Sequence, residues 1–143
     1  MLNRVTEEPL RVRYGETDQM GHAYYGSYLL WFEQARGAWC RDRGFTYRGL
    51  EQMGYKLPVV EVHARFKGEV KYDDLIVVRI RLTEIKRSEM RFDYDILNTA
   101  NDKVVTEGYT WHVLMGAEPK AISVPPHILA MLERDPTLFE SVS

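Results

Sequence analysis

The 143-residue sequence predicts an α+β domain in which a five-stranded antiparallel sheet wraps around one long central helix. Three observations lead to this prediction. A short alternation of apolar and polar residues comes first, a single long helical stripe follows, and four further alternating runs fill most of the remaining chain. A half-buried sheet has one apolar face to cover, and the sequence offers one sizeable helix to cover it. No linker or repeat divides the chain, so we expect residues 1–143 to form one domain.

The first strand is predicted from Leu10 to Tyr14, where apolar and polar residues alternate. A turn-rich segment, GETDQMGH, then runs from Gly15 to His22. Its glycines and its Asp18-Gln19 pair are typical of a loop.

The long helix is predicted from about Tyr24 to Arg43, with Gly44 as its C-terminal cap. Apolar residues at i, i+4, i+7 and i+11 form one face. These residues are Tyr28, Phe32, Ala35 and Trp39, and Leu29 and Cys40 widen the face. The charged residues lie mostly off this face, and they are Glu33, Arg36, Arg41 and Asp42.

Four later runs alternate with period two, which is typical of strands with one buried face. The residues predicted to face the core are Val60, Val62, Ala64 and Phe66; Val78, Ile80 and Leu82; Met90, Phe92, Tyr94 and Ile96; and Tyr109, Trp111, Val113 and Met115. Residues 98–102 are expected to form the hairpin turn between the last two runs. Such a sheet leaves its edges open, so we expect pairing between subunits as a homodimer or homotetramer.

The composition excludes several classes of protein. A net charge of −2 gives no pull toward nucleic acid or an anionic membrane. No stretch approaches the roughly 20 apolar residues of a membrane-spanning helix, and the N-terminus lacks the apolar run of a signal peptide. The single cysteine, Cys40, cannot form an internal disulfide. We therefore expect a cytoplasmic protein, and no histidine or carboxylate pair has the spacing of a metal site.

Two segments resemble a known family. The sequence YGETDQMGHAYYGSY at Tyr14–Tyr28, continuing to FEQAR at Phe32–Arg36, resembles the opening of 4-hydroxybenzoyl-CoA thioesterase-like enzymes of the hotdog fold. PVVEVHARF at Pro58–Phe66, followed by YDD at Tyr72–Asp74, is similar to the second strand and the next turn of that family. The resemblance runs from about Leu10 to Met115. It implies a hotdog fold and hydrolysis of an acyl-CoA thioester to free acid and coenzyme A, without a cofactor.

The resemblance also implies roles for residues around the helix start. The aspartate that matches Asp18 is the catalytic carboxylate of the family, as nucleophile or as general base. Backbone N–H groups near Tyr24 and Tyr25 would polarise the thioester carbonyl, since a helix N-terminus presents unpaired donors. Many relatives have a histidine at the position of Tyr25, and here a histidine occurs instead at His22. His22 is therefore a candidate helper.

Substrate binding is assigned to two places. The Lys86-Arg87-Ser88 turn matches the position where relatives hold the nucleotide, and lysine and arginine both suit phosphate. Arg65 and Lys67 are weaker candidates for the same contact. Tyr28 is a candidate for lining the acyl pocket. The acyl group itself is open, because aromatic, branched and aliphatic groups all fit the composition.

Several structural interpretations compete with these roles. Asp18 has the sequence context of a turn or capping residue as well as that of a catalyst. Glu33 is a possible catalytic carboxylate on the helix, although its i+3 spacing to Arg36 favours an ion pair. His63 and His112 are interpreted as structural residues on strands, and Cys40 as inert packing.

Two other functions remain open at the sequence level. A hotdog hydratase or dehydratase would act on acyl thioesters through an Asp–His pair, but its spacing differs from that of Asp18 and His22. A non-catalytic module that binds acyl-CoA would bind tightly and turn over slowly. Product analysis with acyl-CoA esters separates the three functions.

Overall fold

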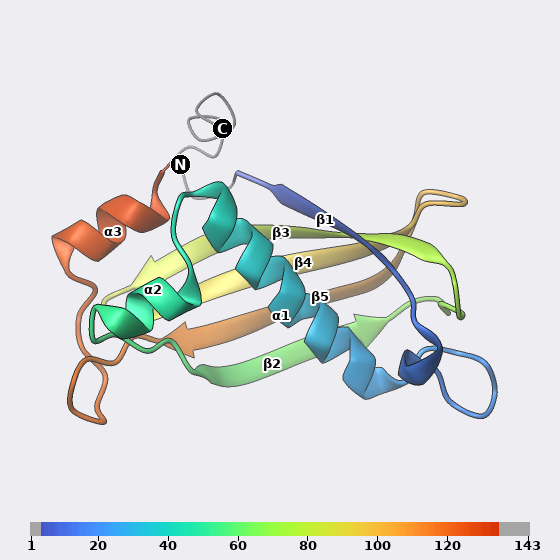
Figure 1. Ribbon diagram of the computed structural model, residues 1–143, viewed down its shortest axis with the longest axis horizontal. Helices are drawn as coiled ribbons and strands as arrows, with labels where there is room; N and C mark the ends of the chain where they lie inside the picture. Colours follow the sequence, from blue (N-terminus) through green and yellow to red (C-terminus); the bar gives the residue numbers. More distant parts are fainter. Residues whose placement is uncertain (1–3, 135–143) are drawn as a thin grey trace.

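The computed structural model describes residues 4–134 and has the predicted architecture, a five-stranded antiparallel sheet packed on one long helix (Figure 1). The strands are β1 (Thr6–Arg11), β2 (Val59–Phe66), β3 (Leu75–Lys86), β4 (Glu89–Asn98) and β5 (Lys103–Val113). The helices are α1 (Tyr25–Asp42), α2 (Tyr47–Gln52) and α3 (Pro126–Leu132), with a 3-10 turn at Tyr14–Glu16. The strand order is β1-β3-β4-β5-β2. In the described part of the chain, no helix is long and apolar enough to cross a membrane.

The central helix agrees with its predicted bounds and buries the predicted face. Tyr28, Phe32, Ala35 and Trp39 are all buried. Two flanking residues differ from the prediction. Leu29 is exposed because α1 packs on β1 and β3 and leaves its other flank uncovered. Arg36 is buried, and its guanidinium donates to the hydroxyl of Tyr94.

The first strand lies earlier than predicted. β1 ends at Arg11, where it pairs with Leu75, and Tyr14 begins the 3-10 turn instead. The apolar–polar alternation at Leu10–Tyr14 continues past the end of β1, because Val12 is buried although it follows the strand. The pattern therefore does not mark the end of the strand.

The buried faces of β3 and β4 match the prediction, whereas β5 has the opposite phase. The residues of β5 and its extension that are buried are Val105, Thr106, Thr110, His112 and Leu114. Tyr109 lies on the outer face, stacked on His63 with ring centroids 4.9 Å apart, and the Arg91 guanidinium lies 4.0 Å from the Tyr109 ring. The prediction was wrong because these aromatic rings are covered on the outer face, while Thr110 and His112 hydrogen-bond to each other inside.

The apolar side of β2 faces the same side of the sheet as α1, as predicted for Val62 and Phe66, but it is only partly covered. The prediction was wrong for Val60, because the strand is irregular between Val59 and Glu61 and Val59 pairs with buried His112 instead. Val62 pairs with Thr110 and Phe66 with Thr106, so both share the face of those buried threonines. Both remain more than 40% exposed. β2 is therefore an edge strand with an open apolar face.

Arg43, at the end of α1, joins distant parts of the chain. Its side chain is fully buried, stacks on Trp39 at 4.0 Å and donates to the hydroxyl of Thr6 and the carbonyl of Arg4. Its own carbonyl accepts from Arg134. The first and last described residues thus bond to the same residue.

Candidate active site

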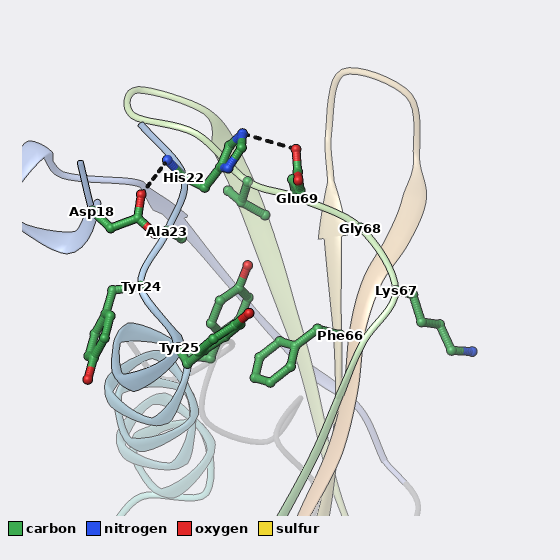
Figure 2. A pocket seen from close by; sticks show the side chains of 11 residues that line it. Asp18, His22, Ala23, Tyr24, Tyr25, Phe66, Lys67, Gly68 and Glu69 are labelled. Carbon is green, nitrogen blue, oxygen red and sulfur yellow. Dashed lines mark hydrogen bonds and ion pairs between the residues drawn. The ribbon is translucent and has the colours of Figure 1, made fainter. Parts of the chain in front are cut away.

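A cavity of about 580 Å³ lies where the loop before α1 meets the end of β2 (Figure 2). It is lined by Asp18, His22, Ala23, Tyr24, Tyr25, Tyr28, Phe66, Lys67, Gly68, Glu69 and Val70. Five residues predicted from the sequence are therefore brought together, namely Asp18, His22, Tyr24, Tyr25 and Tyr28. The segment from Phe66 to Val70 forms the opposite wall.

The loop that carries Asp18 is closed by its own hydrogen bonds. The Asp18 amide donates to the carbonyl of His22 at 2.8 Å, and Gly21 turns the chain with a φ of 81°. Oδ1 of Asp18 accepts from the amides of Met20 at 2.9 Å and His22 at 3.3 Å. Oδ2 has no hydrogen-bond partner among residues 4–134. One carboxylate oxygen thus stabilises the turn, and the other is available to a ligand.

Glu16 fixes this loop to α1. Its carboxylate accepts from the amide of Arg13 at 2.8 Å and from the indole of Trp31 at 2.9 Å. Its carbonyl accepts from the hydroxyl of Ser27 and the amide of Tyr24. Burial raises the pKa of Glu16, but the hydrogen bonds from Arg13 and Trp31 outweigh it and leave the pKa below its usual value. The site is therefore held by an ionised, buried carboxylate that sequence reasoning did not identify.

The start of α1 has unpaired amides, at positions slightly different from those expected. The amide of Tyr24 donates to Glu16, so it is not free to bind a substrate. The amides of Tyr25 and Gly26 have no acceptor within the described residues, and no side chain caps the helix. These two N–H groups are the available donors, because a helix cannot satisfy its own first amides.

His22 forms a pair with Glu69. Its Nε2 lies 3.0 Å from a carboxylate oxygen of Glu69, as Figure 2 shows. A β-bridge between His22 and Lys71 and the hydrogen bond from Ala23 to Val70 hold the two segments together. Glu69 was not predicted, because nothing in its local sequence indicates that it meets residues 47 positions away.

Aromatic rings form the inner wall of the cavity. Tyr25 and Tyr28 both contact Phe66, with ring centroids 4.9 and 4.8 Å apart. Tyr28 is buried, and this burial raises the pKa of its phenol. Tyr24 is exposed, and its ring lies over Gly26, where a Cβ atom would come within 2.8 Å of it.

The predicted phosphate-binding turn lies away from this cavity. Lys86, Arg87 and Ser88 join β3 to β4 at the end of the sheet opposite Asp18 (Figure 1). Along the 12 residues of β3 this separation is about 35 to 40 Å, at about 3.3 Å per residue. Within one protomer the structure does not bring this turn to Asp18. Lys67 does line the cavity, but its ammonium forms an ion pair with Glu107 and points away from the other lining residues (Figure 2).

The remaining candidates have structural surroundings. No ion pair joins Glu33 to Arg36 among the described residues, so that expectation was wrong. His63 stacks on Tyr109 outside the sheet, and His112 is buried in a hydrogen-bonded chain. Burial raises the pKa of the Cys40 thiol to about 12, which makes it unreactive. Within residues 4–134, no cluster of three or more histidine, cysteine or acidic side chains could hold a metal ion.

Known proteins share the sequence pattern and the fold of this chain. The model of the thioesterase-like superfamily matches residues 12–132. The acyl-CoA thioesterase YbgC of Haemophilus influenzae is 31% identical over 98 residues, which cover 68% of this chain and 72% of that protein. The crystal structure of a DHNA-CoA thioesterase from Staphylococcus aureus superimposes with a TM-score of 0.84 at 25% identity, covering 97% of this chain and 95% of the other. A hypothetical protein from Aquifex aeolicus also gives a TM-score of 0.84, at 29% identity, covering 90% of this chain and 99% of the other.

Proposed function

Because the chain belongs to the thioesterase-like superfamily and has the hotdog fold, we propose that it hydrolyses an acyl-CoA thioester to a free acid and coenzyme A. The observation that carries the proposal is the composition of one cavity. It holds a carboxylate with a free oxygen, Asp18, at the start of a helix whose Tyr25 and Gly26 amides are unpaired. A base or nucleophile beside oxyanion donors is what acyl transfer requires.

In the proposed reaction, Oδ2 of Asp18 attacks the thioester carbonyl or takes a proton from an attacking water. The amides of Tyr25 and Gly26 stabilise the oxyanion that develops, aided by the partial positive charge of the helix N-terminus. The carbon–sulfur bond then breaks and coenzyme A leaves as a thiolate. If Asp18 is the nucleophile, water next hydrolyses the acyl–Asp18 anhydride, which releases the free acid and restores the carboxylate; if Asp18 is the base, the free acid forms directly. A thiolate is a good leaving group, so little acid assistance is needed.

His22 is proposed as a secondary helper. Its pairing with Glu69 orients the imidazole at the mouth of the same cavity. Such an imidazole can shuttle a proton between water and the leaving group. Loss of His22 should therefore matter less than loss of Asp18.

The nucleotide of coenzyme A is proposed to contact Lys86, Arg87 and Ser88 of a second protomer. These residues lie far from Asp18 of their own chain, but antiparallel pairing of two β2 edges would bring the far end of one sheet beside the site end of the other. Changing Lys86 and Arg87 to alanine should then raise KM for the CoA ester more than it lowers kcat. The corresponding pantetheine ester, which lacks the nucleotide, should be unaffected.

Asp18→Asn tests the central assignment. Asparagine keeps an oxygen that can accept from Met20 and His22, so the loop should keep its shape. The variant loses charge and basicity, and kcat for thiol release should fall by about 10² to 10⁴ with little change in ester binding. Asp102→Asn, in a distant hairpin turn, is the control and should leave kcat unchanged. Near-normal kcat in a folded Asp18→Asn would mean that Asp18 serves the turn alone.

The two other functions give different products in the same assay. A hydratase or dehydratase would change the acyl chain and release no free thiol. A binding module would bind the CoA ester tightly but would not convert it to any product. Release of coenzyme A and free acid in equal amounts is the expected outcome.

A further inference from the structure

A second, smaller cavity of about 220 Å³ lies between α1 and β2, beyond the aromatic wall of the first. Its sides are apolar, formed by Leu29, Leu30 and Phe32 of α1 and by Val59 and Val62 of β2. Arg36 also lines it. The two cavities therefore follow one another along the same helix and the same strand.

Arg36 is unusual for a residue that lines an apolar cavity. The residue is buried, with 8% of its surface exposed. Its hydrogen bond goes from Nη1 to the phenol oxygen of Tyr94 at 3.0 Å, and no carboxylate lies within 4.0 Å in the part of the chain that the structure describes. A buried cation without an anion is costly, so an oxygen acceptor that enters the cavity would be strongly favoured.

The groups behind Arg36 do not neutralise its charge. His112 donates from Nδ1 to the carbonyl of Leu57 at 3.2 Å, which fixes its tautomer and makes Nε2 an acceptor. The hydroxyl of Thr110 then donates to Nε2 at 2.8 Å and accepts from Tyr94 at 2.6 Å. The chain of hydrogen bonds thus runs in one direction, from Arg36 to a backbone carbonyl, through neutral groups. It fixes the guanidinium in place. The buried phenol of Tyr47 also interacts with the guanidinium, and burial raises its pKa, so this partner is neutral as well.

We propose that this cavity receives the far end of the acyl group, and that Arg36 selects acyl groups which carry an oxygen acceptor there, a carboxylate above all. The inference rests on the proposed thioesterase function and adds a substrate class to it. From Tyr25 to Arg36 the helix rises by about 16 Å, at about 1.5 Å per residue. Side chains on a helix lean toward its N-terminus, so the distance from the Arg36 guanidinium to a thioester at Tyr25 is shorter than this helix rise. Tyr25 is 69% exposed and can turn aside from Phe66 to admit the chain.

Glu33 lines the same cavity from the solvent side and opposes an anionic ligand. It is exposed, whereas Arg36 is buried, and the two form no ion pair. Neutralising Glu33 should therefore strengthen the preference that Arg36 creates. This opposite effect gives the test a matched control.

The experiment compares two CoA esters of equal chain length, one with a methyl end and one with a terminal carboxylate, over a series of lengths. A third ester with a terminal hydroxyl separates charge from simple hydrogen bonding. In Arg36→Met, kcat/KM for the carboxylate ester should fall about 10-fold or more, through KM, while the methyl ester changes less than about twofold. Arg36→Lys should restore part of the preference, and Glu33→Gln should increase it.

Binding of non-hydrolysable thioether analogues, measured by calorimetry, separates this inference from the catalytic one. A preference for the carboxylate analogue that Arg36→Met removes supports the inference even if Asp18→Asn remains active. Equal affinity of the wild type for the carboxylate and methyl analogues would overturn the inference. It would also be overturned if a folded Arg36→Lys lost the same factor of affinity for both analogues. A change in subunit number caused by Arg36→Lys would show instead that Arg36 pairs with a second copy, which also overturns it.

Discussion

Two buried polar residues, Glu16 and His112, lie beside the two cavities, and the pKa of each is lower than its usual value. Glu16 is ionised beside the loop that carries Asp18, and its pKa lies below the usual value. His112 is neutral behind Arg36, because burial and then the charge of Arg36 lower its pKa to about 4. Hydrogen bonds to the charged carboxylate lower the pKa of Glu16 against the effect of burial, whereas burial itself lowers the pKa of His112. Both shifts make the folded state less stable in acid.

Glu16→Gln should lower both the stability and kcat. Glutamine cannot accept from Arg13 and Trp31 as strongly, so the free energy of unfolding at neutral pH should fall by about 1 to 3 kcal/mol. A lowered carboxyl pKa contributes stability above the unfolded-state value, near 4.5, which is lost as the pH falls through the folded-state pKa. The difference between wild type and variant should therefore narrow in acid. Urea unfolding across this range is the measurement, with exposed Glu51→Gln as the control that shows no such convergence.

His112 should make the protein less stable between pH 6.5 and about 4. In this range the unfolded chain binds a proton at His112 and the folded chain does not, so stability falls as the pH falls and then levels off. The full effect is about 3 kcal/mol. His112→Gln should flatten this part of the urea-unfolding profile, whereas His63→Gln, on the outer face, should leave it as in the wild type. Parallel profiles for the wild type and His112→Gln would contradict the prediction.

At the scale of elements, the contact between α1 and β5 depends on Gly108. A Cβ atom there would come within 2.5 Å of the carbonyl of His63 and within 2.8 Å of the Phe32 ring. Phe32 in turn stacks on Tyr94 at 4.1 Å, so it cannot move without disturbing the helix. A glycine in β5 thus sets how closely the helix approaches the sheet.

Gly108→Ala should destabilise the fold by about 1 to 3 kcal/mol through overpacking. Gly15→Ala is the matched control, since a Cβ at Gly15 meets no atom within 4 Å. Thermal unfolding should show a clear drop in Tm for the first variant and little change for the second. A Tm for Gly108→Ala equal to that of the control would mean that α1 can shift freely over β5.

Local patterns in the sequence predict strands and helices, but not the contacts between residues that are distant in the chain. Period-two runs predicted β3 and β4 together with their buried faces, because their apolar residues face the core. The same reasoning gave the wrong face for β5, because Thr110 and His112 are buried as partners of Tyr94 and Arg36, which are distant in sequence. For the same reason Asp18 and the helix start could be predicted from one contiguous segment, whereas Glu69 and Phe66 could not.

At the scale of the whole molecule, the two sheet edges differ in a way that predicts how subunits pair. β1 is short, contains Pro9 and carries Glu7 and Glu8, features that protect an edge from pairing. β2 is longer, has no proline and shows an open apolar face that includes Val62. We therefore expect oligomers to form through β2.

Val62→Lys should shift the protein toward monomers, because an inward-pointing charge on an edge strand opposes pairing. Its molar mass in solution, measured by light scattering after gel filtration, should fall relative to the wild type. Val5→Lys, an exposed valine just before β1, should leave the mass unchanged. A monomeric wild type, or an unchanged mass in Val62→Lys, would exclude pairing through this edge.

The bonds of Arg43 have a consequence for the topology of the chain. Residues 4 and 134 both hydrogen-bond to this one residue, so a linker could join these two positions. A chain in which residue 134 is linked to residue 4 could be circularly permuted, with new termini opened at an exposed turn. The hairpin turn at residues 99–102, between β4 and β5, is exposed and suitable for the new opening. A permuted chain of this kind should fold to the same sheet order, although β4 and β5 would then lie at opposite ends of the sequence.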